Sequence, residues 1–574
     1  MDFQTIDTDL VVLGSGIAGL RAAIQFDLMS KGRYEVCVLS KVQVMRSHSV
    51  APEGGAAAVM GKGDSYEQHA YDTIKGSDYL ADQDVVEQFV REAPNEILQL
   101  DHWGMPWARD RDGNLEARAF GAHETPRTYY AYDRTGFFLM KTLYDKLLGG
   151  NKVRIFHEFF AVGIIVSDGR FRGIVTIERR TGNFVFFKGK ALIIATGGLG
   201  RIYSYATYSH TVTGDGHAIA YRAGLPLKDM EFIQWLPTTL VPYGIPATEA
   251  LRGHGALLLN SEGERFMKKY APNKMELAAR DIVVRAIYTE LASGRGVKGP
   301  RETNSVLLDA RPVGSEKLKG IYKTFRENCI NFLKKDPIEE LIPVIPAPHY
   351  SMGGIHVQSM SMDTTIVGVY SAGEVACLSL HGANRLGSNS IPACLVTGKW
   401  AGKSAYEYIS RIWQESSTND YIQEVNSQVN RSYRYIKNET GSFNVFELRN
   451  RVYDVADNYL GVFREESRLN LAISEIRKIK RDLNDLKVSD SSIEYNLEWV
   501  NVHELYNIVE LAEVVAVSAL RRKESRGAHY RTDYPHRNDN EFLSHTIVQF
   551  DPAALRVSSL PVKITNWAPK EREY

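Results

Sequence analysis

The ten residues from His381 to Ser390 combine a cation, small hydrogen-bonding side chains and two glycines, with little that could pack in a core. They follow a strand-like apolar run at 366–373 and directly precede a helix-like pattern. Ser390 would be a good N-cap and Pro392 suits a first turn, so free backbone N–H groups and the positive end of a helix dipole would face an electron-rich group. Arg385 adds a planar fork suited to carboxylate or phosphate. A polar loop that merely caps a helix would explain Ser390 alone, whereas the whole stretch predicts an anion site.

Two further segments place an arginine close to a carboxylate. Residues 248–255 read Thr-Glu-Ala-Leu-Arg-Gly-His-Gly, and Arg280 precedes Asp281. Glutamate and arginine three residues apart lie on one side of a helix, where such pairs are common at protein surfaces. Alone, both segments would be interpreted as surface ion pairs, so a catalytic interpretation depends on what the rest of the chain binds.

A dinucleotide-binding turn lies near the N-terminus. The apolar run at residues 9–13 predicts a buried strand, and a helix is predicted at residues 20–30. Between them, Gly14 permits a tight turn, Gly16 allows backbone to approach a pyrophosphate, and Gly19 allows the helix to pack closely on the strand. The strand–turn–helix setting favours a nucleotide site over a chance match.

The second strand of this unit, predicted at residues 34–39, ends at Ser40 and Lys41. An NAD-binding unit usually has Asp or Glu at this point, where the carboxylate binds the ribose. The sequence therefore disfavours NAD held in the usual way and leaves a flavin dinucleotide open.

Composition narrows the class of protein. The chain has 574 residues, enough for several domains, and its 69 Lys plus Arg equal its 69 Asp plus Glu, so no net charge favours nucleic acid. Four scattered cysteines without C-x-x-C spacing argue against a disulfide framework, a zinc site or an iron–sulfur cluster in this chain. No secretion signal is evident, and the best apolar run, residues 508–520, is short and contains two glutamates. We expect a cytoplasmic protein that would attach to a membrane only through a partner.

The residues after the second strand carry a family resemblance. Arg46-Ser-His-Ser-Val-Ala51 is followed by Glu53, Gly54 and Gly55, a run with little bulk that suits backbone lying against a flat ligand. This stretch closely resembles the flavoprotein subunit of fumarate reductase and succinate dehydrogenase. The resemblance implies FAD linked covalently through His48 to the flavin 8α-methyl group.

The resemblance continues over essentially the whole chain. Thr196-Gly197-Gly198 ends a buried strand as in the second flavin signature of the family, and Thr213-Gly-Asp215-Gly follows as in the family. Glu374 resembles the acidic residue that binds the flavin ribityl chain, and the helix after Ser390 would stabilise negative charge on the reduced ring. Each motif alone could be a tight turn, but their order along one chain makes that interpretation poor.

The resemblance also assigns the catalytic roles. Arg280 would deliver a proton to the substrate, relayed through Glu249 and Arg252, while the flavin supplies the hydride. An arginine can act as an acid because matched pKa values matter more than absolute ones. The substrate-binding residues implied are Thr248, His349, Arg385 and Phe120, although Phe120 could equally be a core aromatic.

Two positions depart from the family pattern. Where the family motif has a histidine that donates to one substrate carboxylate, this chain has Leu236. Loss of one charge-assisted hydrogen bond typically costs about 1.5–3 kcal/mol. His254 replaces a glutamate of the family and is a candidate for the missing donor. The departure leaves affinity, preferred direction and substrate identity open.

We predict an α/β fold with an FAD-binding Rossmann-like domain, an inserted capping domain, a helical bundle and a small C-terminal domain. The FAD-binding domain would take residues 1–235 and 348–408, with the capping domain at 236–347. The helical domain would span 409–535 and the C-terminal domain 536–574. Helices are predicted at residues 406–415, 421–435, 447–459, 465–483 and 502–520, and a β-meander at 153–185.

A basic segment follows the last predicted helix. Residues 521–526 read Arg-Arg-Lys-Glu-Ser-Arg, and Gly527 is expected to end the helix. Such a run is usually a solvated helix end. The family also carries this segment, which implies a role near the flavin or at a subunit interface.

These observations predict the flavoprotein subunit of a fumarate reductase or succinate dehydrogenase complex. Because no cluster is expected in this chain, the implied partners are an iron–sulfur subunit and a membrane-anchor or quinone- or thiol-linked subunit. One alternative is a stand-alone flavin oxidase of the L-aspartate oxidase type. The other is a flavin-bearing subunit with little dicarboxylate turnover, or a reductase for a different enoate, which Leu236 suggests.

Overall fold

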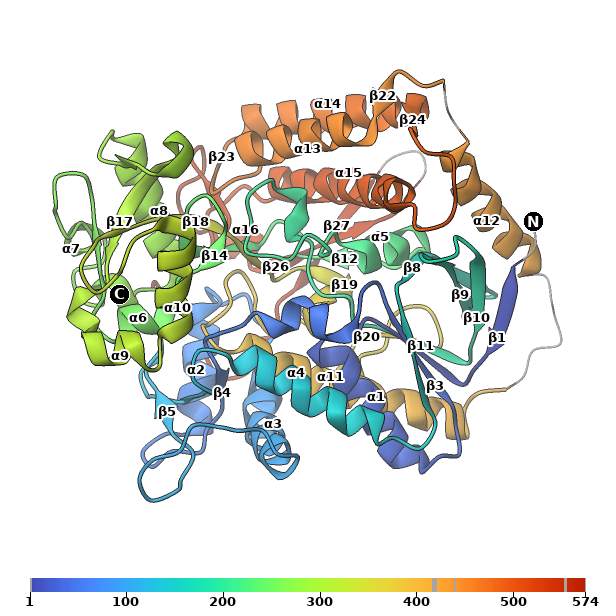
Figure 1. Ribbon diagram of the computed structural model, residues 1–574, viewed down its shortest axis with the longest axis horizontal. Coiled ribbons are helices and arrows are strands. Elements are labelled where there is room, and N and C mark those ends of the chain that lie inside the picture. The colour runs from blue at the N-terminus through green and yellow to red at the C-terminus, as the bar shows by residue number, and fades with distance from the viewer. Residues whose placement is uncertain (1–2, 415–420, 438–439, 552–554, 573–574) are drawn as a thin grey trace.

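A five-stranded parallel sheet forms the centre of the nucleotide-binding region (Figure 1). The computed structural model describes residues 3–414, 421–437, 440–551 and 555–572. The strands, in spatial order, are β20 (Val369–Ser371), β11 (Ala191–Ile194), β2 (Leu10–Leu13), β3 (Val36–Ser40) and β7 (Val153–His157). All four pairings are parallel, so the carboxyl ends of the strands share one edge, where ligands bind in open α/β sheets.

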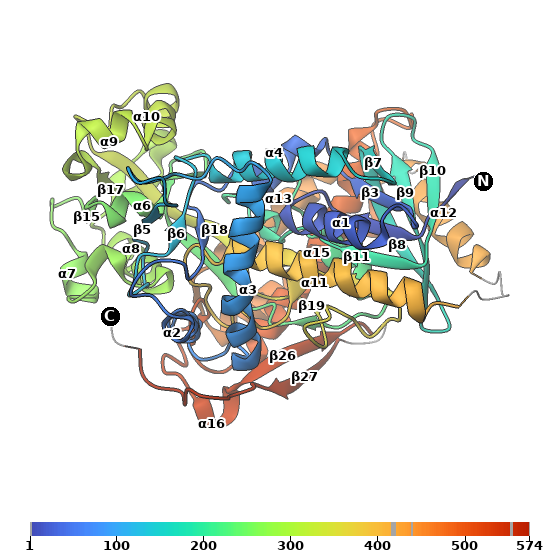
Figure 2. The ribbon, with the colours of Figure 1, turned by 90° about the horizontal axis from the view of Figure 1, so that it is seen from below.

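Two long helices pack together beside this sheet. They are α1 (Ile17–Ser30) and α11 (Ser390–Arg411), which lie side by side in both ribbon views (Figure 2). A Cβ on Gly402 would collide with the carbonyl oxygen of Ala22, so the glycine is needed for this close approach. The helix expected at 406–415 is the end of α11 rather than a separate element, and Glu415 lies outside the described residues.

The start of α11 differs by one residue from the expectation. Its N-cap is Asn389, not Ser390, and no side chain caps it. The amide of Asn389 is used elsewhere: Nδ2 donates to Thr73 Oγ1 at 3.0 Å, and Oδ1 lies 3.0 Å from His69 Nε2. The helix therefore leaves its first N–H groups without a side-chain cap, as a ligand site at this end requires.

The predicted β-meander is only partly correct. Strands β8 (Phe159–Ser167), β9 (Arg170–Glu178) and β10 (Phe184–Lys188) are antiparallel neighbours, and β1 (Gln4–Asp7) adds to β10 in parallel. The segment at 153–157 instead forms β7 of the central sheet, with Val153 opposite Val36. Alternating apolar residues fit either sheet, and the pattern could not distinguish them.

Residues between 233 and 351 form a separate lobe around a second sheet (Figure 1). The sheet contains β13 (Ile233–Leu240), β14 (Ile245–Pro246), β15 (Leu257–Leu259), β16 (Val297–Lys298), β17 (Asn304–Asp309) and β18 (Ile342–Ser351). Its helices are α6 (Glu249–Gly253), α7 (Met267–Tyr270), α8 (Arg280–Ala292), α9 (Ser315–Lys319) and α10 (Lys323–Asn328). The lobe has its own buried core, which Phe120 from the nucleotide-binding region joins.

The helical region follows the predicted apolar stripes. It contains α12 (Ile422–Ile436), α13 (Val445–Tyr459), α14 (Glu466–Asp482) and α15 (Leu497–Arg521), of which α13, α14 and α15 pack together (Figure 1). The predicted bounds of α12, α13 and α14 are within two residues of those observed. α15 begins five residues before the expected start. Among the described residues, no helix is long and apolar enough to cross a membrane.

The prediction that the basic segment after α15 is a solvated helix end was wrong. The helix ends at Arg521, not at Gly527, and the side chains of Arg522 and Arg526 are buried rather than solvated. Arg522 Nε donates to Glu231 Oε1 at 2.7 Å, and Arg526 Nε donates to Glu524 Oε1 at 2.8 Å. These carboxylates neutralise the buried guanidinium groups, as burial of charge requires.

This segment also contacts the loop that the sequence singled out. Gly527, with φ of +52°, packs so closely on Ala383 that a Cβ would sit 2.5 Å from its carbonyl oxygen. The next residue, Ala528, donates its N–H to the same oxygen at 2.9 Å. Beyond it, β26 (Ser544–Gln549) and β27 (Arg556–Pro561) join a sheet with β12 (Leu227–Lys228), β19 (Gly354–His356) and β21 (Ala376–Cys377).

Candidate active site

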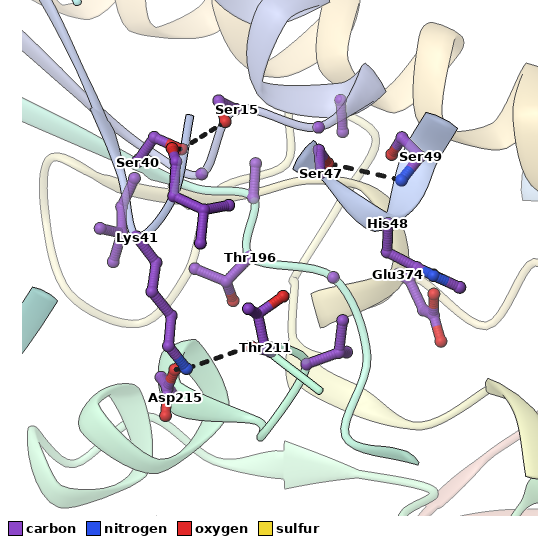
Figure 3. Close-up of a pocket in the computed structure, with 18 of the residues that line it drawn as sticks. Ser15, Ser40, Lys41, Ser47, His48, Ser49, Thr196, Thr211, Asp215 and Glu374 are labelled. Carbon is purple, nitrogen blue, oxygen red and sulfur yellow. Dashed lines mark hydrogen bonds and ion pairs between the residues drawn. The ribbon is translucent and has the colours of Figure 1, made fainter. Parts of the chain in front are cut away.

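A first cavity opens at the carboxyl edge of the central sheet (Figure 3). Among the predicted cofactor residues, its lining includes Gly14, Gly16, Ser40, Lys41, His48, Thr196, Gly197, Asp215 and Glu374. Gly14 has φ of +113°, and a Cβ on Gly16 would lie 2.9 Å from Ser49 Oγ. Gly19 does not line the cavity, because it packs on Gly14 so closely that a Cβ would collide with the Gly14 carbonyl oxygen. Gly14 and Gly19 thus have the turn and packing roles that the motif predicts, and Gly16 lines the cavity at the place where the motif puts a pyrophosphate.

Lys41 is the centre of a largely buried charge network at one end of this cavity. Its Nζ lies 2.7 Å from Asp215 Oδ2 and 2.6 Å from Glu504 Oε1, and donates to Thr213 Oγ1 at 2.9 Å. Asn507 Nδ2 donates to the other oxygen of Asp215 at 2.8 Å. Glu504 and Asn507 belong to α15, so the helical region directly supports the nucleotide cavity.

His48 projects into the same cavity from a short 3₁₀ turn (Figure 3). Its Nδ1 accepts the backbone N–H of Ser209 at 3.3 Å, which leaves Nε2 as the nitrogen available for another bond. Burial and the nearby charge of Arg201 lower the pKa of His48 to about 4, so the imidazole is neutral at physiological pH. The neutral imidazole is the form that can attach to a ligand, and Nε2, which carries the proton while Nδ1 accepts, would lose that proton as the bond forms.

A second cavity continues from the first and shares His48, Ser49 and Glu374 with it. Its lining brings together the predicted residues Gly54, Gly55, Phe120, Thr248, Glu249, Arg280, His349, Arg385 and Ser390. These residues come from both parts of the nucleotide-binding region and from the lobe at 233–351. Arg252 does not line the cavity and lies behind Glu249.

Glu249, Arg252 and Arg280 form a buried chain. Arg280 Nε donates to Glu249 Oε2 at 2.7 Å, and Arg252 Nη2 lies 3.9 Å from the same oxygen. Although burial raises the pKa of Glu249, the guanidinium groups of Arg280 and Arg252 lower it below its usual value, so the carboxylate is ionised. Arg280 Nη1 donates to Gln234 Oε1 at 2.8 Å, which fixes the plane of the guanidinium.

Arg385 and His349 line the second cavity together with Glu249 and Arg280. The Arg385 guanidinium lies over the ring of Tyr350, 4.4 Å from its centre, and its Nε has no hydrogen-bond partner among the described residues. Burial and the charge of Arg280 lower the pKa of Arg385 to about 10, so it stays a cation at neutral pH. Burial and the same arginines lower the pKa of His349 well below its usual value, so this histidine is neutral.

The two departures from the family pattern have different outcomes. Leu236 lines the second cavity and is 3 % exposed, so an apolar side chain lies where a donor was expected. His254 does not line the cavity; its Nδ1 is 2.5 Å from Tyr322 Oη. His254 therefore offers no replacement for the missing donor in this arrangement. Phe120 both lines the cavity and joins the core of the lobe, so the two readings of this residue are compatible.

Comparison with known families matches residues 9–391 to the FAD binding domain and residues 449–574 to the C-terminal domain of the fumarate reductase flavoprotein. The fumarate reductase flavoprotein subunit of Mycobacterium tuberculosis is 42% identical over the full length of both chains. The chain belongs to the fumarate reductase and succinate dehydrogenase flavoprotein family. The succinate dehydrogenase flavoprotein subunit of Rickettsia bellii is 39% identical and covers 97% of this chain and 95% of its own. A solved Escherichia coli quinol fumarate reductase chain superposes with a TM-score of 0.96 at 36% identity, covering 100% of this chain and 99% of its own.

FAD, the cofactor of this family, fits the two joined cavities. Gly14 and Gly16 line the first cavity, so backbone without a side chain faces it at the turn after β2. Gly54 and Gly55 line the second cavity in the same way. The uncapped start of α11 and the free nitrogen of His48 face the passage between the cavities. The arrangement accommodates a dinucleotide at one end and a flat ring at the other.

Some site residues of this family member were not found from the sequence. Gln234 lies two residues before Leu236, yet its contact with Arg280 depends on how β13 meets α8. Glu504 and Asn507 had no signal, because an amphipathic helix offers many equivalent polar positions. Thr207 follows no motif; it lines the second cavity and contacts His349.

Proposed function

We propose that this chain is the catalytic flavoprotein subunit of a fumarate reductase or succinate dehydrogenase complex. Bound FAD supplies hydride transfer at its N5 position, and the protein binds and protonates the dicarboxylate. The relatives named as reductase and dehydrogenase subunits favour this function over a stand-alone L-aspartate oxidase-type enzyme.

One observation carries the proposal: the second cavity has an excess of buried positive charge. Two arginines, Arg280 and Arg385, line the cavity and are each at most 6 % exposed. Glu249 is ionised and neutralises part of their charge. Burial raises the pKa of the other two lining carboxyl groups, to about 8 for Glu53 and to about 7 for Glu374, so they offset less of it. Burying unpaired charge is costly, so such a site is complementary to a dianion. Fumarate and succinate are dianions whose two carboxylates could be held at opposite ends of the cavity.

The side chains then divide into binding and proton-transfer roles. Arg385, His349 and Thr248 would hold the carboxylates, while Phe120 would pack on the substrate between them. Arg280 would give its proton to the substrate carbon and regain it through Glu249, whose carboxylate it already contacts at 2.7 Å. Arg252 would resupply Glu249, so that proton transfer needs no bulk water at the reacting atoms.

The partners follow from where electrons must go. Among the described residues no cluster of His, Cys, Asp or Glu could hold a metal, so an iron–sulfur subunit would carry electrons to or from the flavin. A membrane-anchor subunit, or a quinone- or thiol-linked one, would complete the complex. Peripheral attachment at the cytoplasmic membrane surface, the four predicted domains with their boundaries, and covalent linkage through His48 belong to the same proposal.

Anaerobic reoxidation tests the function directly. The holoprotein is reduced with dithionite and then mixed with fumarate, and the return of oxidised flavin absorbance is followed. Rapid reoxidation by fumarate, but not by the monoacid crotonate, is expected. Reoxidation by crotonate alone would assign the site to a different enoate, which is the substrate change that Leu236 suggests.

Acid precipitation tests the covalent bond. Yellow colour that stays with the denatured pellet supports attachment through His48, and His48→Ala should move the colour to the supernatant. A yellow supernatant from the unaltered protein would contradict the linkage.

A further inference from the structure

Thr207 lies beside His349 in the lining of the second cavity. Its Oγ1 is 2.9 Å from His349 Nδ1 and 3.1 Å from the carbonyl oxygen of Pro348. The backbone N–H of Thr207 also donates to Pro348 O, at 3.0 Å. That oxygen therefore has a donor whichever way the hydroxyl points, and the hydroxyl hydrogen is available to His349.

The position of one proton decides what His349 can do. As a neutral imidazole it carries a single N–H, on either Nδ1 or Nε2. Nδ1 faces Thr207, and among the described residues this is the one hydrogen bond recorded for the His349 ring, which lines the cavity. A carboxylate can only accept hydrogen bonds, so His349 binds one through Nε2 only when Nδ1 is the accepting nitrogen.

We infer that Thr207 is a positioning residue that donates its hydroxyl hydrogen to His349 Nδ1 and so keeps the His349 proton on Nε2, where it is donated to a substrate carboxylate. The inference rests on the proposed function, because it requires a carboxylate in this cavity. It matters more in this chain than the family pattern suggests, since Leu236 removes another donor from the same cavity. Two neutral donors to the substrate remain, Thr248 and His349. One of them, His349, would thus depend on the hydroxyl group of Thr207.

A matched pair of variants in the assembled holoenzyme tests this role. Thr207→Val keeps the shape but removes the donor, while Thr207→Ser keeps the hydroxyl. Malonate is the binding probe, because this dicarboxylate lacks the CH–CH bond that the flavin would oxidise, and its binding is followed by the flavin absorbance. For Thr207→Val we expect the malonate Kd and the fumarate KM to rise about tenfold to a hundredfold. We expect kcat to change by less than about threefold, because the contact holds the substrate equally before and during the reaction.

Two further comparisons separate positioning from a general structural defect. Thr207→Ser should return Kd and KM to within about threefold of the unaltered enzyme. In a His349→Ala background, Thr207→Val should cause no additional loss, because residues that act as one unit are not additive. The inference is overturned if Thr207→Val leaves malonate binding unchanged, if serine does not rescue it, or if the two losses add. An unaltered enzyme that neither binds malonate nor reduces fumarate would overturn the proposed function as well, so the two failures are distinguishable.

Discussion

The nucleotide cavity and the substrate cavity adjoin each other but are built on different principles. Backbone shape dominates the first: Gly14 and Gly16 open the turn, and the charge of Lys41 is balanced by Asp215 and Glu504 within hydrogen-bonding distance. Side-chain charge dominates the second, where the buried Arg280 and Arg385 line the wall and Glu249 is ionised. The charged side chains of the first cavity are therefore paired within the protein, whereas the positive charge of the second cavity is left for a dianionic ligand to neutralise.

The largest effect is expected where a single charged side chain does the chemistry. Arg280→Lys keeps the charge but loses the fork that joins Glu249 and Gln234, so the proton relay is broken. Fumarate reduction should fall by roughly 10²- to 10⁴-fold, the usual contribution of a positioned acid. Steady-state turnover of the holoenzyme measures it. Flavin content and spectrum should be unchanged, and full activity in this variant would remove Arg280 from the proton-donor role.

The next effect tests whether the charge of the nucleotide cavity is balanced internally. Lys41→Met leaves the largely buried carboxylates of Asp215 and Glu504 without their cation. Removing one partner of a fully buried pair typically costs about 3–5 kcal/mol. Because the side chains of Lys41 and Asp215 are 18% and 13% exposed, we expect a loss near the lower end of that range. Denaturant unfolding of the apoprotein measures the loss. The matched control is Lys141→Met, which removes an exposed helix pair with Asp145 and should change stability by less than about 1 kcal/mol. Equal effects of the two substitutions would show that the network around Lys41 is not a buried pair in energetic terms.

The contrast between the two cavities also explains which of their residues could be predicted from the sequence. The first cavity is made largely of local motifs, so Gly14, Gly16, His48 and the end of β3 at Ser40 were found from contiguous residues. Residues that complete the cavities from a distance were not found. Asn507 reaches Asp215 across 292 positions of sequence, and no local pattern encodes that contact.

The prediction of a solvated helix end for the basic segment after α15 was wrong for the same reason. Arg522 looked solvated because the carboxylate that neutralises it, Glu231, is 291 positions away. The strand β7 was assigned to the meander instead of the central sheet, because its partner β3 is not its sequence neighbour. Periodicity identifies an element and its buried face, but the partner of that face is decided by the tertiary fold.

A third prediction concerns the apolar wall of the substrate cavity. Leu236→His would add a hydrogen-bond donor to a wall that now has none at this position, and malonate binding should tighten by about tenfold. Titration of the flavin absorbance with malonate measures it. Leu236→Met, which changes shape little and adds no N–H, should leave the affinity nearly unchanged. Weaker binding in the histidine variant alone would mean that the cavity has been reshaped around Leu236.

The smallest expected effect is a shift in pH dependence at His48, where the two cavities meet. Its pKa is lowered to about 4 by burial and by Arg201, against an ordinary value near 6.5. If this imidazole is the point of attachment, FAD added to the apoprotein should be bound covalently at a rate that is constant from about pH 8 down to about pH 5, because the reactive neutral form predominates throughout. Arg201→Gln removes the repelling charge and raises the pKa of His48 toward its ordinary value. The rate should then begin to fall at a higher pH, and attachment near pH 5.5 should be slower than in the unaltered protein. Arg201→Lys keeps the positive charge and serves as the control. Identical pH profiles for the glutamine and lysine variants would mean that burial alone sets the protonation of His48, and that Arg201 has no part in keeping this junction neutral.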